Sequence, residues 1–246
     1  MSLNTSPTKP LAVITGASRG LGFESARGLA SAGFDLALVA KDEAGLQDAA
    51  RRLLVEFPDL EVYCCPANLE QPDATRAVIS KISTLGQVTV LMVAHGVMSE
   101  KMSKTLRTND AEWHRVMAIN LDSVFALLNG LVPAMVEARL GRVIVYSACM
   151  GRMSGPGNTG GYAPYRVSKA GVNALVRNLA HETGLGSRGV LVDAVCPNHS
   201  RTDMGGPNAP RSAAEGAATS IWLATRAFES GDITGVLWED QQIVPW

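Results

Sequence analysis

The chain has 246 residues, of which 46% are hydrophobic and 18% are charged. This composition allows a large core, and the length lies at the upper end of the single-domain range. Lys and Arg together number 22, against 23 Asp and Glu, so no summed charge favours binding to nucleic acid or to an anionic membrane surface. We therefore expect a small-molecule partner, with no nucleic acid and no membrane.

The first ten residues, MSLNTSPTKP, lack the apolar run of a signal peptide. No later segment approaches the roughly 18 consecutive apolar residues of a membrane span. We predict a cytoplasmic protein with a flexible segment over residues 1–10 and a single domain over residues 11–246.

The residues that most often bind transition metals are scattered along the chain. The paired spacings of a zinc site are absent, so we predict no metal site and interpret the cysteines as small core residues. The residues concerned are Cys64, Cys65, Cys149, Cys196, His95, His114, His181 and His199.

Short apolar runs rich in Val, Leu and Ile alternate with longer segments of helical period, which is typical of buried parallel strands joined by crossover helices. In chain order, the expected strands are Leu11–Thr15, Asp35–Ala40, Glu61–Cys65, Val88–Ala94, Arg142–Ser147, Val190–Cys196 and Val236–Trp238. The pattern predicts an α/β fold with a single doubly wound parallel sheet of Rossmann type, about seven strands, and helices on both faces. Ligands of such folds bind beyond the carboxyl ends of the strands.

The first expected strand leads into TGASRGLG, residues 15–22, before a helix that we expect from Glu24 to Ala30. Glycines at such a turn let backbone N–H groups approach a pyrophosphate, and the helix N-terminus attracts its charge. The glycine spacing differs from the usual dinucleotide pattern, but its place between strand and helix favours dinucleotide binding over an ordinary turn. The expected cofactor contacts in this turn are Gly16, Ser18, Arg19, Gly20, Leu21 and Gly22.

Cofactor choice depends on the end of the second strand, where an acidic side chain would bind the adenine ribose and basic side chains would accept a 2′-phosphate. The acid is missing at Ala40, whereas Lys41 and Arg19 offer two positive charges. This favours NADP(H) over NAD(H). Asp42 keeps NAD(H) open, although it is equally suited to capping a helix that begins near Glu43.

Tyr165 and Lys169 lie one helical turn apart, so they share a face of the helix expected after Pro164. A phenol titrates near pH ~10, and a neighbouring ammonium stabilises the phenolate. The pair therefore predicts proton transfer at the cleft. The alternative is that the two side chains only make a surface contact.

Three motifs, TGASRGLG, Asn120 and YRVSK at residues 165–169, resemble those of the short-chain dehydrogenase/reductase family, and the resemblance covers nearly the whole chain. Residues 201–211 and 243–246 are most similar to carbonyl-reductase-type members. The resemblance implies that Tyr165 is the acid/base, that Lys169 lowers its pKa and holds the nicotinamide ribose, and that Asn120 anchors a water relay. It also implies cofactor contacts at Tyr165, Lys169, Asn68, Leu69, Ala94, Gly96, Pro197 and Thr202.

The chain departs from the family pattern most clearly at the catalytic serine, whose position is occupied by Ala148. Ser147 lies one residue earlier, and a shift of one residue along a strand turns a side chain to the opposite face unless the strand end redirects it. We take Ser147 as a candidate catalytic residue and Ser154 as a weaker one. Without either, the site loses a hydrogen bond worth about 3 kcal/mol to a developing oxyanion.

Three further departures indicate a specialised member of the family. Residues 93–96, VAHG, replace Asn-Asn-Ala-Gly. Asn68 replaces an aspartate, and Asn198 replaces a glycine at a turn where asparagine is tolerated.

These observations predict an NADP(H)-dependent oxidoreductase that reduces a ketone or aldehyde to an alcohol, or catalyses the reverse, on a specialised metabolite. Ala148 keeps an alternative open, namely a cofactor-binding protein with non-redox activity, such as cyclisation or dehydration, or with a regulatory role. A third possibility, a scaffold protein, would leave the glycine turn without a ligand. The resemblance also implies a homodimer or homotetramer.

Overall fold

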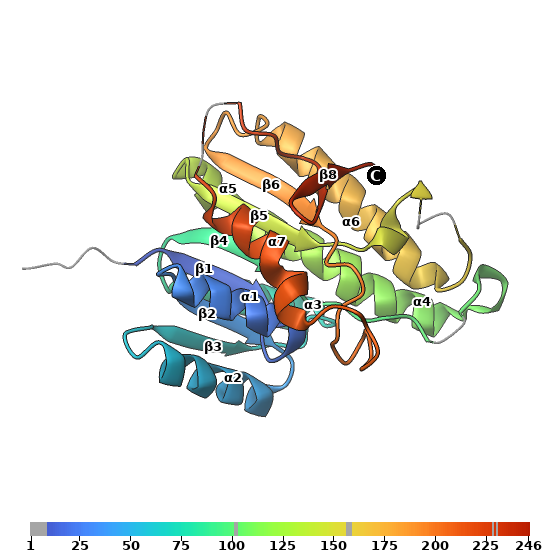
Figure 1. The fold of residues 1–246 in the computed structure, drawn as a ribbon, viewed down its shortest axis with the longest axis horizontal. Helices are drawn as coiled ribbons and strands as arrows, with labels where there is room; N and C mark the ends of the chain where they lie inside the picture. The colour runs from blue at the N-terminus through green and yellow to red at the C-terminus, as the bar shows by residue number, and fades with distance from the viewer. Residues whose placement is uncertain (1–8, 101–102, 156–158, 228, 230) are drawn as a thin grey trace, which may run out of the picture.

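The computed structural model describes residues 9–100, 103–155, 159–227, 229 and 231–246. A single sheet of eight strands forms its centre, in the order β3-β2-β1-β4-β5-β6-β7-β8 (Figure 1). Strands β1 to β7 pair in parallel, and β8 pairs antiparallel with β7. The strands are β1 (Leu11–Thr15), β2 (Asp35–Ala40), β3 (Val62–Pro66), β4 (Val88–Val93), β5 (Gly141–Tyr146), β6 (Val190–Val195), β7 (Leu237–Glu239) and β8 (Gln242–Val244).

The predicted α/β sheet and its first seven strands are confirmed, with boundaries that differ by one residue at several ends. The prediction of about seven strands missed β8. A tight turn returns the chain from β7, with Asp240 and Gln241 both at positive φ (52° and 59°), as two-residue hairpin turns require. Only two of the three residues of β8, Ile243 and Val244, are apolar, so no apolar run marks this strand in the sequence. Of the segment predicted to be flexible, residues 1–8 lie outside the described residues.

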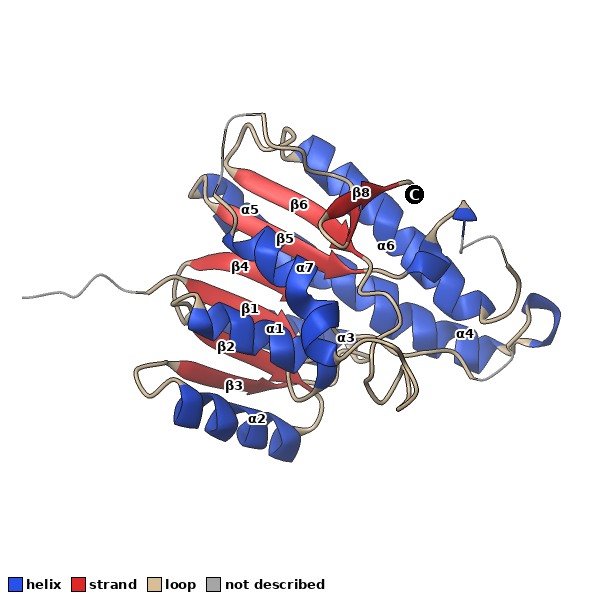
Figure 2. Ribbon diagram, viewed as in Figure 1, coloured by secondary structure: helices blue, strands red, loops and turns tan. Residues whose placement is uncertain are grey.

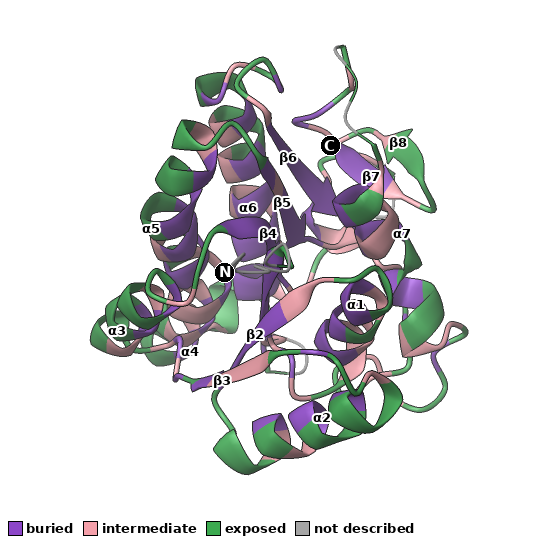
Figure 3. Cartoon of the chain, turned by 90° about the vertical axis from the view of Figure 1, so that its left-hand side faces the viewer, coloured by how far each residue is buried: buried purple, intermediate pink, exposed green. Residues whose placement is uncertain are grey.

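Helices cover both faces of the sheet (Figure 2). The main helices are α1 (Gly20–Ser31), α2 (Glu43–Glu56), α3 (Pro72–Ile82), α4 (Asp110–Met117), α5 (Ser123–Glu137), α6 (Ala163–Glu182) and α7 (Ala213–Thr225). One core contains the side chains of α1, α2 and α7, and the other contains those of α3, α5 and α6. Because neighbouring strand residues point to opposite faces, Val13 belongs to one core and Ile14 to the other. The central strands, β1, β2, β4, β5 and β6, are therefore buried on both sides, whereas the edge strands β3 and β8 are more exposed (Figure 3).

A π-helical turn, η2 (Ala118–Asp122), joins α4 to α5. The joined helix, Asp110–Glu137, has 28 residues and a mean hydropathy of 1.5 over its most apolar window, so its length and composition alone would allow it to cross a membrane. Its apolar residues Leu127, Leu131 and Met135 are instead buried against the sheet. The hydropathy of this helix is thus explained by core packing. Two shorter turns are η1 (Thr105–Arg107) and η3 (Cys149–Gly151).

Candidate active site

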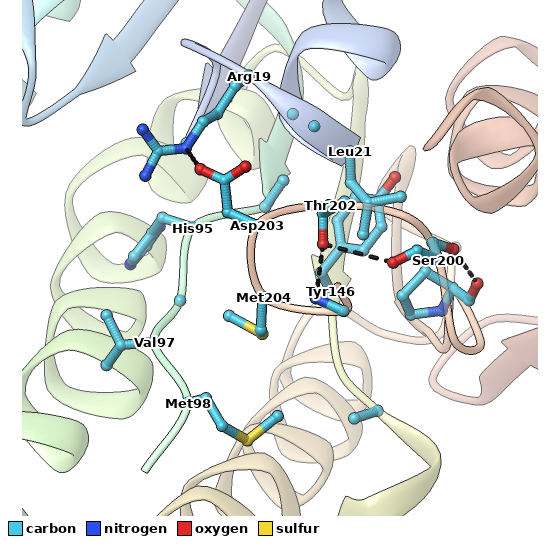
Figure 4. A pocket seen from close by; sticks show the side chains of 18 of the residues that line it. Arg19, Leu21, His95, Val97, Met98, Tyr146, Ser200, Thr202, Asp203 and Met204 are labelled. Atoms are coloured by element: carbon cyan, nitrogen blue, oxygen red, sulfur yellow. Dashed lines mark hydrogen bonds and ion pairs between the residues drawn. The ribbon is translucent and has the colours of Figure 1, made fainter. Parts of the chain in front are cut away.

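A cleft of about 1550 Å³ opens at the carboxyl edge of the sheet, between segments that follow β1 to β6 (Figure 4). Apart from Asn120 and the weaker candidate Ser154, every site residue predicted from the sequence lines it. The predicted residues at the cleft are Gly16, Ser18, Arg19, Gly20, Leu21, Gly22, Lys41, Asn68, Leu69, Ala94, Gly96, Ser147, Tyr165, Lys169, Pro197 and Thr202.

The turn after β1 requires glycine at residues 16 and 22. A Cβ on Gly16 would lie 2.9 Å from the His95 Cα atom, and one on Gly22 would lie 2.2 Å from the Gly16 carbonyl oxygen. Gly20, where α1 begins, has a φ of +58°. The first turn of α1 contains no acidic residue, so its free N–H groups present partial positive charge to the cleft. This cradle suits a pyrophosphate.

The end of β2 presents Lys41, which is exposed, after a buried Ala40. Helix α2 begins at Glu43 as predicted, but the side chain of Asp42 makes no capping hydrogen bond to it. Asp42 therefore occupies the predicted N-cap position but lacks the side-chain hydrogen bond expected of a cap. Across the cleft, Arg19 Nε forms a 2.8 Å ion pair with Asp203 Oδ2, and both side chains are largely exposed (Figure 4).

Tyr165 and Lys169 lie on the first turns of α6 and are only 6% and 5% exposed. The Lys169 ammonium donates a 2.7 Å hydrogen bond to the Tyr146 carbonyl oxygen and lies 5.9 Å from the centre of the Tyr165 ring. Because both residues are buried at the cleft, the alternative of a surface contact is wrong.

Burial is the main cause of the pKa shifts of both Tyr165 and Lys169. It raises the pKa of Tyr165 above its ordinary value of 10, with smaller contributions from Cys196 and Cys149. Burial also lowers the pKa of Lys169 to about 8. In the protein alone, Tyr165 is therefore not acidified as the resemblance implied. At neutral pH it is a protonated phenol, the form that donates a proton.

Asn120 lies in the π-helical turn and is fully buried. Its Oδ1 accepts a 2.8 Å hydrogen bond from the Val97 amide, and its Nδ2 donates to the Val97 carbonyl at 2.9 Å and to Ser168 Oγ at 3.1 Å. A Cβ on Gly96 would lie 3.3 Å from Asn120 Oδ1 and 3.6 Å from Lys169 Nζ. Asn120 thus holds the segment after β4 close to Lys169.

The hydroxyl groups of the two serine candidates are bound within the protein. The Ser147 hydroxyl donates to Asn173 Oδ1, and the Ser147 amide still donates to the Val195 carbonyl at 2.8 Å, as a strand residue would. The Ser154 hydroxyl donates to the Trp246 carbonyl at 3.2 Å. Ala148 itself lines the cleft.

Comparison with known proteins agrees with this geometry. The family model described as short chain dehydrogenase matches residues 10–212. The chain belongs to the short-chain dehydrogenase/reductase family. It is 34% identical to the 3-oxoacyl-(acyl-carrier-protein) reductase FabG of Staphylococcus epidermidis over 196 residues, which is 78% of this chain and 76% of that protein. The FabG of Escherichia coli K12 is also 34% identical, over 79% of this chain and 75% of its own length.

A solved structure of a metagenomic short-chain oxidoreductase in complex with NADP superposes with a TM-score of 0.76. It is 30% identical to this chain and covers 94% of it, and the chain covers 96% of that structure.

The role of His95 at the cleft was not predicted from the sequence. The imidazole Nδ1 is 2.7 Å from Thr15 Oγ1, and Nε2 is 3.0 Å from the Ile119 carbonyl and 2.8 Å from Ser123 Oγ. Since a carbonyl only accepts, Nε2 carries the hydrogen and Nδ1 accepts from Thr15. Burial and the nearby Lys169 charge lower the pKa of His95 to about 4. A neutral histidine therefore connects the end of β1 to the π-helical turn.

The core role predicted for the cysteines is confirmed for Cys65 and Cys196, which belong to the buried core. The prediction did not include that Cys149 and Cys196 also line the cleft of this short-chain dehydrogenase/reductase. The available signal was their position, because Cys196 directly follows the strand that becomes β6 and Cys149 lies three residues beyond the end of β5.

Proposed function

We propose that the protein is an NADP(H)-dependent oxidoreductase that reduces a ketone or aldehyde to an alcohol, or catalyses the reverse. The observation that carries this proposal is the buried Tyr165 and Lys169 pair, facing the same cleft as the glycine turn after β1. Family membership and the FabG relatives support it. We further propose a specialised metabolite as substrate, a cytoplasmic location, and one catalytic domain over residues 11–246.

NADP(H) fits the cleft better than NAD(H). The glycine cradle and the N-terminus of α1 would hold the pyrophosphate. Arg19 and Lys41 would bind the 2′-phosphate, and Ala40 offers no carboxylate to repel it. Side chains and backbone groups of Ser18, Leu21, Asn68, Leu69, Ala94, Gly96, Pro197 and Thr202 would contribute the remaining contacts. The bound cofactor supplies or accepts the hydride.

Tyr165 supplies the proton. As hydride reaches the carbonyl carbon, negative charge develops on the carbonyl oxygen, and the protonated phenol of Tyr165 donates to it. The ammonium of Lys169 stabilises the phenolate that remains, and its bond to the Tyr146 carbonyl fixes its position. Asn120 keeps the segment after β4 in place beside this ammonium.

The test is the Tyr165→Phe variant. We expect turnover to fall by about 10² to 10⁴, the usual range for loss of a general acid, while calorimetry shows nearly unchanged NADPH affinity. Turnover is followed at the reduced-nicotinamide absorbance band with a panel of ketones, aldehydes and 3-oxoacyl thioesters. Retained turnover would remove Tyr165 from the mechanism.

The Ala148 substitution supports the second candidate function, a non-redox or regulatory role. It predicts NADPH binding without any absorbance change across the substrate panel. A scaffold role predicts no binding of NADPH or NADH at all.

We also propose a homodimer or homotetramer that associates through α5 and α6. A shallow groove between these helices is lined by apolar residues, including Leu121, Leu175 and Phe125, whose side chain is 56% exposed. Exposed apolar patches bordered by polar residues mark association surfaces, and Asp122 and Asn178 border this one. Light scattering with chromatography tests the assembly, and a Phe125→Glu variant should shift it toward the monomer.

A further inference from the structure

Two cysteines that line the cleft follow the carboxyl ends of neighbouring strands. Strands β5 and β6 are parallel neighbours, with Tyr146 opposite Val195, and the Ser147 amide extends the pairing to the Val195 carbonyl at 2.8 Å. Cys196 follows β6 directly, and Cys149 begins the turn η3 after β5. The fold therefore brings together two thiols that are distant in the sequence.

The two side chains lie at the cleft beside the proposed acid. They also interact with each other, an interaction that shifts the pKa of Cys149 downward and that of Cys196 upward. Both residues line the cleft together with Tyr165, and charge on either sulfur would raise the pKa of the Tyr165 phenol. Cys149 is half-buried and Cys196 only 2% exposed, so solvent reaches the pair through Cys149.

This interaction makes the two thiols chemically unequal. The interaction with Cys196, with smaller contributions from the Met150 backbone and Arg152, lowers the pKa of Cys149 to about 6. The same interaction and burial raise the pKa of Cys196. Thiolate is the reactive form of cysteine, so Cys149 is the nucleophile of the pair at neutral pH.

We propose that Cys149 and Cys196 form an oxidation site, at which a peroxide converts the two thiols into an intramolecular disulfide beside Tyr165. The formation of the disulfide is independent of the proposed reductase activity. Only its effect on turnover rests on that proposed function.

The chemistry proceeds in two steps. The Cys149 thiolate attacks one oxygen of hydrogen peroxide, the O–O bond breaks, and the other oxygen leaves as hydroxide, which takes a proton to become water. The sulfur of Cys149 is now a sulfenic acid. The sulfur of Cys196 then attacks it, the S–S bond forms, and hydroxide leaves and takes up the proton lost by Cys196. Two thiols are oxidised, and one peroxide is reduced to two waters.

The disulfide changes the geometry of the cleft. Its sulfur atoms lie about 2.05 Å apart, closer than two sulfurs that are not bonded. The bond therefore ties the turn η3 to the segment after β6 and constrains Ala148 and Pro197, which neighbour the two cysteines on the cleft wall. We expect oxidation to remove most of the turnover, and dithiothreitol to restore it.

The experiment treats the full-length protein with hydrogen peroxide, blocks the remaining thiols with N-ethylmaleimide, and maps cross-linked peptides by mass spectrometry. We expect a peptide pair joining Cys149 to Cys196, the loss of two titratable thiols per chain, and reversal by dithiothreitol. Retention of all the thiols, or a cross-link confined to other cysteines, would overturn the proposal. Peptide mapping needs no substrate, so a failure of the proposed reductase function would not be mistaken for a failure of this one.

Three serine variants complete the test. Cys149→Ser and Cys196→Ser should each abolish the cross-link. Cys64→Ser is the matched control, because the Cys64 thiol lies on β3 and donates at 3.8 Å to the Leu46 carbonyl, outside the cleft. Its variant should form the cross-link and lose turnover on oxidation as the wild type does. Turnover that survives complete cross-linking would overturn the predicted inhibition.

Discussion

The ammonium of Lys169 lies 5.9 Å from the ring centre of Tyr165. In the described part of the chain, no hydrogen bond or ion pair joins this ammonium to an acidic group. Its hydrogen-bond acceptor is the backbone carbonyl of Tyr146. A buried charge with only a neutral acceptor is costly to maintain, which is why its pKa falls to about 8.

This lowered pKa predicts how the reaction depends on pH. The rate of carbonyl reduction should fall as the pH rises through about 8, because the neutral amine no longer stabilises the Tyr165 phenolate. The Lys169→Met variant should lose this dependence, and its kcat should be lower by about 100-fold at pH 7. Steady-state rates across the pH range measure both effects.

An exposed lysine provides the control. Lys104→Met removes one positive charge outside the cleft and should retain the wild-type profile. An unchanged pH profile in Lys169→Met would contradict the role given to the ammonium.

The sequence predicted the features that depend on local patterns. Seven strands were visible because each is a short, mostly apolar run, and the Tyr165 and Lys169 pair because its spacing is one helical turn. The three residues of β8 carried no such pattern. The side chain of Asp42 was assigned by position alone, and whether it caps α2 depends on a rotamer that the sequence does not specify.

Contacts between distant segments were not predictable from one sequence. The partners of His95 come from β1 and from the π-helical turn, and the interaction between Cys149 and Cys196 exists only because β5 and β6 are neighbours. Burial of Tyr165, which reverses the expected direction of its pKa shift, likewise follows from the packing of the whole cleft.

His95 predicts a loss of stability in acid. Its pKa is lowered from 6.5 to about 4 in the folded state, so between these values the unfolded chain binds a proton that the folded chain does not. Stability therefore falls as the pH decreases from about 6.5 toward 4, by about 3 kcal/mol in total from this residue. Urea unfolding at several pH values measures the slope.

The His95→Asn variant is the comparison for this slope. Asparagine keeps a donor and an acceptor but does not titrate, so its unfolding free energy should vary less over the same pH range, even if its stability at pH 7 is lower. The Lys169 charge faces His95 and also lowers its pKa, so Lys169→Met should weaken the pH dependence in part. Equal slopes in wild type and His95→Asn would contradict this account.

Ala148 predicts a gain of activity. A serine at this position would add a hydroxyl donor to the developing oxyanion, and the Ala148→Ser variant should raise kcat, by up to about 100-fold. Ser147→Ala should chiefly lower stability, by about 1 kcal/mol, because it removes the hydrogen bond that the Ser147 hydroxyl donates to Asn173. NADPH consumption and urea unfolding measure the two effects. If Ser147→Ala instead abolishes turnover, Ser147 is the missing donor.

The ion pair between Arg19 and Asp203 predicts a test of cofactor choice. In the absence of cofactor the two charges meet at 2.8 Å, with both side chains largely exposed, so Asp203 competes with a 2′-phosphate for Arg19. Exposed pairs of this kind contribute little, and Asp203→Asn should tighten NADPH binding only a few-fold at low salt, with a smaller effect at high salt. NADH lacks the 2′-phosphate, and its affinity should not change.

Arg19→Ala should weaken NADPH binding and leave NADH binding intact. Equal responses of the two cofactors, measured by calorimetry, would place the 2′-phosphate away from Arg19.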